Sequence, residues 1–540
     1  MLALRDRLKK ARRGTPSLPR QLSMLVYALH RCTQLSRSGV VAAVVLVQLG
    51  CSVLPQSPLD MQTSTPDSTH LTDACPLLLQ RLARRIQVSD GADPLGYPIA
   101  TYPYLRVNRL LASFSKQLNT QARQQAWYQR LYRLGKDARQ VELDNLSPAV
   151  TADTREQLER CIEQRASRDL QAKDVFAQLT RRAQVPDLYS DWQRALGLFP
   201  LTRQIVLRQI ASHQQRWRQQ FNSPALLQGP SRLYQPPLSK PLETELISSW
   251  LEQARNNNPL GLPELDSARQ LALFRHFAPL WQSFTHSSAD LIGRPQWRDG
   301  APDIDTNDPV TYLLPSYTRF NGQILLQLNY MAWFPERPSQ RPLDLYAGPL
   351  DGLIWRVTLD ADGRVLLYDS IHPCGCYHLI FPVAKGLSIK PPDAAVEQPL
   401  ILSGIAPGRE QGRLVLQLTP EDHYLQGIAL ADERKPGAAL DNQSLDNPAL
   451  DNKSDHKSDN RRRYRFDSYH QLRSLATADG RRNLFDPDGL VGATARLERF
   501  LLWPMGVNSP GAMRVWGAHA IGFANRRYFD DPQLFEQFFE

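Results

Sequence analysis

The residues best suited to chemistry stand together in the segment His372–His378, which reads HPCGCYH. Four potential metal ligands alternate there with other residues: His372, Cys374, Cys376 and His378. On an extended backbone this spacing places all four side chains on one side, whereas Pro373 and Gly375 favour a curled loop that folds them around one ion. Imidazoles and thiolates are ligands that zinc prefers, with three plus a water typical of a catalytic site and four of a structural one. The segment is therefore a candidate zinc site.

The two thiols also allow a reading without metal, because the spacing is not that of a zinc finger or ribbon. In an oxidising compartment Cys374 and Cys376 can form a disulfide with each other, or one of them can pair with Cys75 or Cys161. If Cys32 is removed and Cys51 is lipidated, four of the six cysteines remain, and they allow three complete pairings, which the sequence cannot rank. Metal binding, disulfides and free thiols in a packed loop all stay open.

Two further groups of polar residues could carry chemistry. Asp369, Ser370 and His372 have the residue types of a hydrolase triad, but neighbours along a strand point to opposite faces, so Asp369 is not expected to serve His372. A possible polar cleft is formed by four residues in and around the predicted strand 323–334: Arg319, Gln327, Asn329 and Glu336. Solvated strand faces explain these four residues equally well.

The N-terminus has the features of a targeting signal, which would determine where in the cell the protein is located. Residues 1–38 hold nine Lys and Arg against one Asp, and residues 39–49 are the apolar run GVVAAVVLVQL. A basic region before a short apolar run and a small residue resembles a secretory signal. The following Gly50-Cys51 resembles the end of a bacterial lipobox, which implies that Cys51 is the lipidated residue of a membrane-tethered lipoprotein. Gln48 departs from that pattern, which has an aliphatic residue at this place.

Other versions of this address share one consequence. The segment 38–54 offers 17 residues, the shortest length for an uncleaved anchor, and its basic flank would keep the N-terminus in the cytoplasm. A cleaved signal is a further possibility, and Met24 is an alternative start. In each case residues 56–540 are expected outside the cytoplasm, in the cell envelope and facing the periplasm or the exterior.

The charge distribution argues against nucleic acid as a partner. The 540 residues carry a formal net charge of +10, but residues 1–38 alone account for +8. Of the rest, residues 105–218 carry +9 and the remainder is acidic. On an exported protein this basic region is expected to meet anionic lipid or a cell-wall polymer, unless it is simply a solvated helical face.

Hydrophobic periodicity predicts the fold class. Apolar residues recur at helical spacing within the region 105–281, for example at 107, 110, 111, 114 and 118. Near residue 300 the period changes to two, as in Gln323–Phe334, and Asp360–Gly363 has the composition of a hairpin turn between the strands 353–359 and 364–371. We expect an α+β protein in which an N-terminal helical domain precedes an antiparallel β-rich domain.

The predicted organisation has six parts. They are a signal peptide or anchor (1–51), a polar tether (52–72), an α-helical domain (73–290), an antiparallel β-rich domain (300–430), a disordered low-complexity insertion (431–463) and an aromatic-rich C-terminal segment (464–540) that packs on the β-rich domain and has a helix at 489–503.

Two classes of function fit these features. The tether, the basic region and the lack of a strong catalytic motif favour a binding or scaffold lipoprotein. The alternative is a metal-assisted envelope hydrolase that uses the His372–His378 segment, in which zinc would lower the pKa of a bound water. The sequence leaves open whether the protein is an enzyme.

Overall fold

The computed structural model describes residues 74–89, 91–393, 396–431 and 460–540. The predicted signal or anchor with Cys51, the tether and most of the 431–463 insertion lie outside the described residues. In the described chain helices predominate before residue 280 and strands predominate after it, which confirms the α+β fold class. No helix among the described residues is long and apolar enough to cross a membrane.

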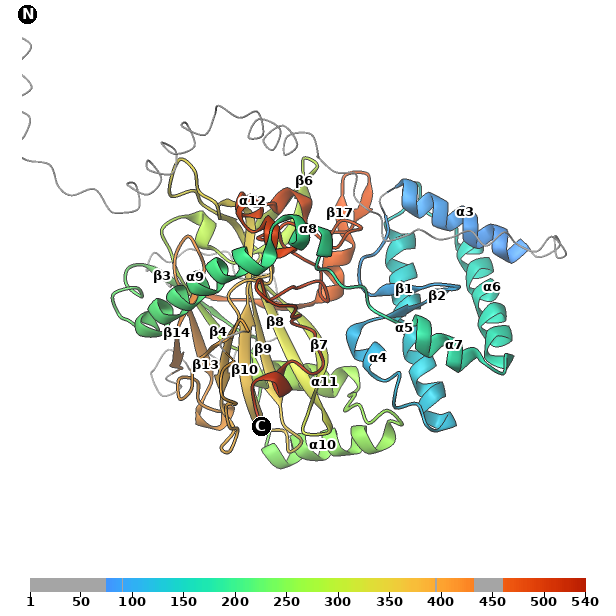
Figure 1. The fold of residues 1–540 in the computed structure, drawn as a ribbon, viewed down its shortest axis with the longest axis horizontal. Coiled ribbons are helices and arrows are strands. Elements are labelled where there is room, and N and C mark those ends of the chain that lie inside the picture. The colour runs from blue at the N-terminus through green and yellow to red at the C-terminus, as the bar shows by residue number, and fades with distance from the viewer. Residues whose placement is uncertain (1–73, 90, 394–395, 432–459) are drawn as a thin grey trace, which may run out of the picture. The chain divides into compact units, whose positions relative to one another are not determined.

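The first part of the described chain is mainly helical (Figure 1). Its elements are α3 (Ala74–Val88), β1 (Tyr97–Ile99), β2 (Tyr102–Val107), α4 (Arg109–Ser113), α5 (Gln121–Asp144), α6 (Ala152–Gln171) and α7 (Val175–Arg182). Side chains from the long helix α5, including Trp127 and Leu131, are fully buried in a core with β2 and α6. Threonine hydroxyls accept hydrogen bonds at the starts of two helices, Thr120 at α5 and Thr151 at α6.

The prediction of one helical face through residues 107–118 was wrong at both ends, because α4 ends at Ser113 and Leu118 lies in no helix. Val107 ends strand β2, and the Asn108 side chain then accepts a hydrogen bond from the Leu111 backbone at 2.9 Å, which starts the short helix α4. Spacing alone could not separate these elements, because Val107 is buried on a strand while Leu111 and Phe114 are buried after it.

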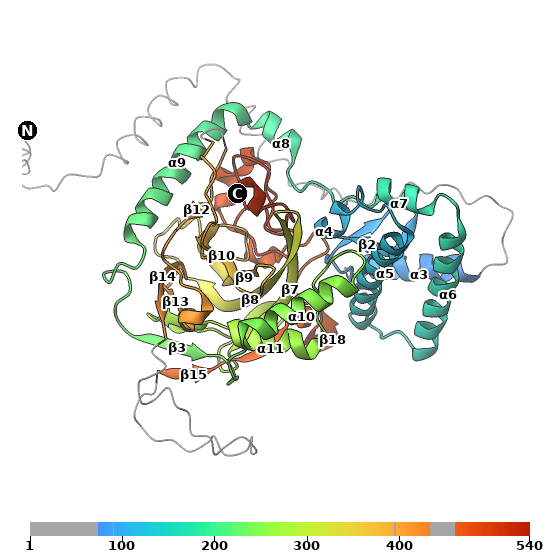
Figure 2. The ribbon, with the colours of Figure 1, turned by 90° about the horizontal axis from the view of Figure 1, so that it is seen from below.

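A seven-stranded sheet lies at the centre of the part of the described chain that follows the first helices (Figure 2). Its strands are, in order across the sheet, β12 (Leu400–Ile401), β11 (Leu379–Pro382), β10 (Val365–Ile371), β9 (Gly348–Leu359), β8 (Gln323–Arg337), β7 (Val310–Phe320) and β16 (Arg465–Ser468). The predicted β9–β10 hairpin is present, with Gly363 at φ +79° in its turn and the Asp360 backbone N–H donating to the Arg364 carbonyl.

A five-stranded sheet packs against this central sheet. Its strands are, in order, β14 (Leu425–Leu430), β13 (Leu414–Leu418), β4 (Leu280–Phe284), β3 (Ser231–Gln235) and β15 (Arg461–Arg463). It is mixed, because β13 runs parallel to β4 and β15 runs parallel to β3. The predicted regions 73–290 and 300–430 therefore share this sheet, with β3 and β4 coming from the first.

Both faces of the central sheet are buried. One face of β8 packs with the five-stranded sheet and with α10 (Thr244–Asn257) and α11 (Ser267–Phe277). It carries the predicted apolar side chains Leu326, Leu328, Tyr330, Ala332 and Phe334. The opposite face was expected to be polar, but it lies in a second core with the C-terminal segment.

The C-terminal segment is mostly irregular, and the predicted helix 489–503 was wrong. Only α12 (Glu498–Leu501) and the 3₁₀ turns η5 (Gly492–Thr494) and η6 (Trp503–Met505) form there. The segment instead runs along its neighbours, as when the Arg514 backbone N–H donates to the Pro373 carbonyl at 2.9 Å. Such contacts satisfy backbone groups that a helix would have paired internally.

Within the region 105–281 that was predicted to be helical, two helices are separated by a short break, α8 (Asp191–Leu196) and α9 (Phe199–Gln220). The break falls at Gly197 and Leu198, and the latter has φ +49°. A side chain at Gly197 would collide with Pro504, because its Cβ would lie 2.5 Å from the Pro504 Cβ. Close packing against the 503–506 turn thus accompanies the break.

Gly135 allows α5 to approach β2 closely, which gives a test of the helical core. A Cβ at this position would lie 2.1 Å from the Tyr104 carbonyl oxygen. We expect Gly135→Ala to lower the free energy of unfolding by about 1–3 kcal/mol, despite alanine's better helix propensity. Urea titration would measure this, with the exposed Gln125→Ala of the same helix as the control. Equal stability of the two variants would contradict the packing argument.

Candidate functional site

The segment His372–His378 is a tight loop between β10 and β11. The His372 backbone N–H donates to the Cys376 carbonyl at 3.0 Å, and the Gly375 N–H donates to the His372 carbonyl at 2.8 Å. Gly375 has φ +91°, and a Cβ there would lie 2.5 Å from the Ala520 carbonyl oxygen. The loop is therefore curled, as the Pro and Gly residues predicted.

Three of the four predicted ligands line one small cavity. Its volume is about 20 Å³, which is room for about one water molecule. The side chains around it combine thiols, an imidazole, phenols, guanidinium groups and carboxyl groups: Arg337, Tyr346, Asp351, His372, Cys374, Cys376, Tyr377, Arg496, Glu498, Gly511 and Met513. His372, Cys374 and Cys376 thus meet in one place, without His378.

His372 ends a buried chain of alternating carboxylates and imidazoles. Its Nδ1 lies 3.2 Å from Asp351 Oδ1, and Asp351 Oδ2 lies 3.0 Å from His423 Nδ1. His423 Nε2 in turn lies 3.4 Å from Asp290 Oδ1. His372 Nε2 is buried and has no hydrogen-bond partner. The chain therefore orients the His372 ring and leaves one of its nitrogen atoms unused beside the cavity.

Asp290 and His423, at the inner end of this row of side chains, are both charged. Burial opposes ionisation of Asp290, but hydrogen bonds from His423 and from the backbone N–H groups of Glu421, Ser287 and His286 lower its pKa to about 2. Burial likewise opposes the charge on His423, yet Asp290 and Asp351 raise its pKa to about 9. His423 is thus an imidazolium held between two carboxylates, stacked on the Phe334 ring at a centroid distance of 4.0 Å.

The two thiols contact each other. The Cys376 backbone N–H donates to Cys374 Sγ at 3.4 Å. A hydrogen bond with Cys374, together with burial, raises the pKa of the Cys376 thiol well above its ordinary value. Cys376 therefore keeps its proton, and the sulfur of Cys374 accepts. Arg514, whose Nε donates to the Cys374 carbonyl at 3.1 Å, adds a positive charge beside the pair.

The opposite wall of the cavity holds Glu498 and arginines. Burial raises the pKa of Glu498 to about 7, although Arg337, Arg496 and Arg514 oppose the rise. Arg337 is held by a hydrogen bond of 2.9 Å from its Nη2 to the Tyr424 hydroxyl. Arg496 Nη1 is buried without a hydrogen-bond partner. The wall can therefore interact with a polar or anionic group.

His378 belongs to a different cluster. Its Nε2 lies 3.0 Å from Asp369 Oδ2, and Asp369 also accepts from Arg356 Nε at 2.8 Å. The Arg356 guanidinium stacks over the Phe529 ring at 3.5 Å and joins the sheet to the C-terminal segment. Asp369 thus serves His378 and Arg356 rather than His372, as the sequence argument against a triad expected.

No group of three or more His, Cys, Asp and Glu side chains among the described residues is arranged to hold a metal ion. The four predicted ligands diverge because Tyr377 adopts φ +61° and turns the chain before His378. The residues present do not form a preformed zinc site, and zinc binding stays a prediction.

The predicted polar cleft residues are not gathered at one place. Gln327 and Asn329 are buried within the sheet, where both hydrogen bond with the Ser316 hydroxyl, at 3.0 and 2.9 Å. Arg319 stacks on Phe114 at the far end of the β7–β8 pair, and Glu336 is exposed at the other end of β8. Gln327 and Asn329 therefore meet at the Ser316 hydroxyl inside the core and do not line a cleft with Arg319 and Glu336.

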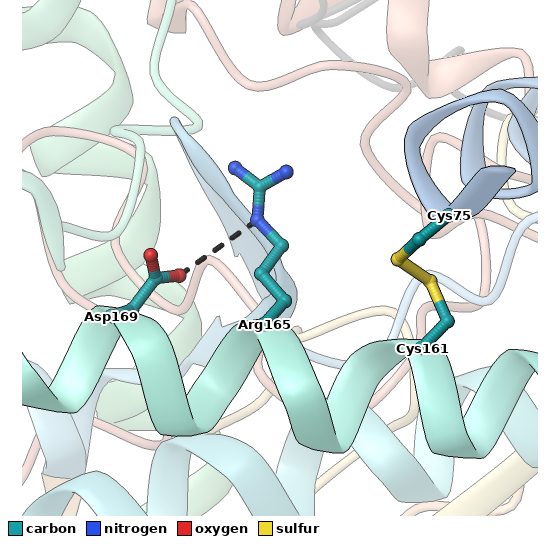
Figure 3. Close-up of a disulfide and its surroundings, with 4 residues drawn as sticks. All are labelled: Cys75, Cys161, Arg165 and Asp169. Carbon is teal, nitrogen blue, oxygen red and sulfur yellow. Dashed lines mark ion pairs between the residues drawn. A yellow bond between two sulfur atoms is a disulfide. The ribbon is translucent and has the colours of Figure 1, made fainter. Parts of the chain in front are cut away.

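The other two cysteines form a disulfide. Cys75 on α3 and Cys161 on α6 are bonded, with their Cα atoms 5.4 Å apart (Figure 3). One turn further along α6, Arg165 Nε and Asp169 Oδ2 form an ion pair at 3.8 Å. Of the three possible pairings, this one leaves Cys374 and Cys376 to each other, and both are free in the structure.

Several residues of the site could not be predicted from the sequence. Asp351, His423 and Asp290 come from three separate parts of the chain, and only the acidic Asp351 within an apolar strand offered a signal. Arg496 and Glu498 lay in a predicted helix that does not form. Comparison of the chain with protein-family models, curated proteins and solved structures found no match.

The buried row of charged side chains around His423 predicts that the stability of the folded protein depends on pH. Because folding raises the pKa of His423 from 6.5 to about 9, its contribution is fully present below pH 6.5 and is lost as the pH rises through 9. We expect His423→Gln to lower the free energy of unfolding by about 3 kcal/mol at pH 6, and this difference should shrink towards pH 9.

Urea titrations of both proteins from pH 6 to pH 9.5 would measure that difference. The control is His286→Gln, whose partly exposed ring pairs with Glu421 and should contribute under about 1 kcal/mol. A difference between His423→Gln and the unchanged protein that stays constant over this range would show that His423 is not charged in the folded protein.

Proposed function

We propose that the chain is an exported protein of the bacterial cell envelope, tethered to the membrane at its N-terminus through Cys51. The Cys75–Cys161 disulfide supports this address, because disulfides persist in oxidising compartments and are rare in the cytoplasm. The basic and apolar N-terminal residues support it independently. The chain from residue 56 on then faces the periplasm or the exterior.

We further propose that the cavity carries out dithiol–disulfide exchange. The observation that carries this proposal is the contact between Cys374 and Cys376 inside a cavity that His372 also lines. Such exchange needs one thiol that attacks the substrate and a second thiol next to it that resolves the product. Cys374 is the attacking residue and Cys376 the resolving one.

The reaction balances without a metal. The Cys374 thiolate attacks one sulfur of a substrate disulfide, and the substrate's other sulfur leaves as a thiolate that takes up a proton. The Cys376 thiol then loses its proton and attacks Cys374, which releases the second substrate thiol and leaves a Cys374–Cys376 disulfide. Two electrons pass to the substrate, and the reverse sequence oxidises a substrate dithiol. His372 Nε2 beside the cavity can accept or return the proton of Cys376.

The two cysteines can be told apart by trapping. With residues 52–540 purified, oxidised glutathione should trap a mixed disulfide on Cys374 in Cys376→Ser, whereas Cys374→Ser should trap at least tenfold less. In the unchanged protein the peptide that carries both cysteines should lose two hydrogens. Mass spectrometry of the intact protein and its peptides measures both results.

Ser370→Ala is the matched control, because its buried hydroxyl has no hydrogen-bond partner and lies outside the cavity. It should oxidise like the unchanged protein. Equal trapping in both cysteine variants would remove the assigned roles. Bound zinc at one per chain, lost in Cys374→Ser and Cys376→Ser, would instead favour the metal-assisted hydrolase, and inert reduced thiols without metal would favour a binding or scaffold protein.

The address is tested in cells. We expect the full chain in the membrane fraction of a bacterium, with Cys75 and Cys161 resistant to alkylation until a reductant is added. Cys51→Ala should abolish labelling by a fatty-acid analogue, while Cys32→Ala, which changes a cysteine within the predicted signal, should leave it intact. Recovery of the chain in the soluble cytoplasm with reduced Cys75 and Cys161 would contradict the proposal.

A further inference from the structure

A cluster of exposed apolar side chains lies away from the cavity's interior. Eight large apolar residues in two short stretches are 44–70% exposed: Trp192, Leu196, Leu198, Leu201, Ile205, Leu497, Phe500 and Leu501. We call these residues the apolar patch. Large exposed apolar groups in a cluster are uncommon on proteins that meet only water, and mark interaction sites.

The two stretches of the apolar patch meet at η6. The Trp192 and Trp503 rings contact each other edge to face, with centroids 5.5 Å apart. The Ser190 backbone N–H donates to the Gly506 carbonyl at 2.7 Å, and Arg194 Nε donates to the Met505 carbonyl at 2.9 Å. These contacts fix α8 against the turn that follows α12, and Figure 1 shows α8 near α12. The apolar patch is therefore one surface on a fixed frame.

The exposure of side chains along α9 shows that the apolar patch faces outwards. Leu201, Ile205 and Arg208 follow one another at helical spacing and are all exposed. Trp217, near the other end of α9, is its one buried side chain among the described residues. The apolar half of the outer face thus passes directly into a polar half that begins with Arg208.

The charges beside the apolar patch are mainly positive. Arg208 and Arg499 are exposed at its edges, and the Arg499 guanidinium lies 4.8 Å from the Phe500 ring centre. The acidic Asp191 is already ion-paired with Arg526. Tryptophan, phenylalanine and leucine next to arginine form the composition of surfaces that lie at the boundary of lipid headgroups and acyl chains.

We infer that the apolar patch inserts into the headgroup region of an anionic lipid bilayer. The occupant is a lipid surface because the apolar residues are rimmed by arginines, which pair with anionic headgroups. This inference deepens the proposed address, since it adds a second membrane contact to the N-terminal tether, but it concerns a surface of the folded part and can be tested without the tether.

Vesicle binding tests the inference. A protein comprising residues 52–540 lacks the apolar run 39–49 and keeps every described residue, all of which belong to one compact unit. We expect it to cosediment with vesicles of phosphatidylglycerol and phosphatidylethanolamine, and at least tenfold less with phosphatidylcholine. Leu201→Ser/Ile205→Ser should weaken binding to the anionic vesicles by about tenfold or more.

The control is Leu77→Ser/Val88→Ser on α3, whose side chains are as exposed but lie outside the apolar patch. It should bind like the unchanged protein, and circular dichroism should show that both double variants are folded. Quenching of tryptophan fluorescence by brominated lipid that becomes weaker in Trp192→Phe would place the patch in the bilayer.

Binding unaffected by Leu201→Ser/Ile205→Ser would overturn the inference. So would a dimer of the unchanged protein that this variant dissolves, since a second copy would then cover the patch. These results are independent of cell fractionation. Vesicle binding without export would refute only the proposed envelope location, and export without vesicle binding would refute only the insertion of the apolar patch into lipid.

Discussion

The buried imidazolium of His423, held between Asp290 and Asp351, is the interaction on which the organisation of this protein depends. Asp290 follows strand β4, and His423 lies in the turn between β13 and β14. These three strands belong to the five-stranded sheet, so both residues are attached to it. Asp351 lies in β9 of the seven-stranded sheet. The two sheets are therefore joined by charge as well as by apolar packing. Removing one partner from such a set leaves a buried charge without compensation, which is strongly unfavourable.

The same buried row of imidazoles and carboxylates also orients a side chain of the cavity. Asp351 uses one oxygen for His423 and the other for His372, so the element that joins the sheets also fixes the ring next to the thiols. The loop itself is held from the other side, where Arg514 contacts the Cys374 carbonyl and Ala520 leaves room only for a glycine at 375. A pair of thiols in a tight loop is thus placed by contacts from three distant segments, which gives it a defined geometry.

Local signals predicted what depends on local physics. The Asp360–Gly363 turn predicted the β9–β10 hairpin, and Asp266 caps α11 as its residue type indicates. The curled loop and the meeting of three of its polar side chains followed from Pro373 and Gly375. The partners of His372 could not be predicted, because Asp351 and His423 are 72 residues apart and neither stands in a motif. Periodicity failed at 489–503 because short turns pair part of that backbone and irregular segments pair the rest, as when the Val491 N–H donates to the Met513 carbonyl.

The cavity and the apolar patch meet at α12. Within this four-residue helix Glu498 lines the cavity, whereas Phe500 and Leu501 are 66% and 64% exposed. The cavity has room for about one water molecule, so a disulfide can reach Cys374 only when part of its wall moves. A helix with one turn and few internal hydrogen bonds is among the least costly parts of the fold to displace. Whatever contacts Phe500 and Leu501 therefore acts on the same short element that carries Glu498 into the cavity wall.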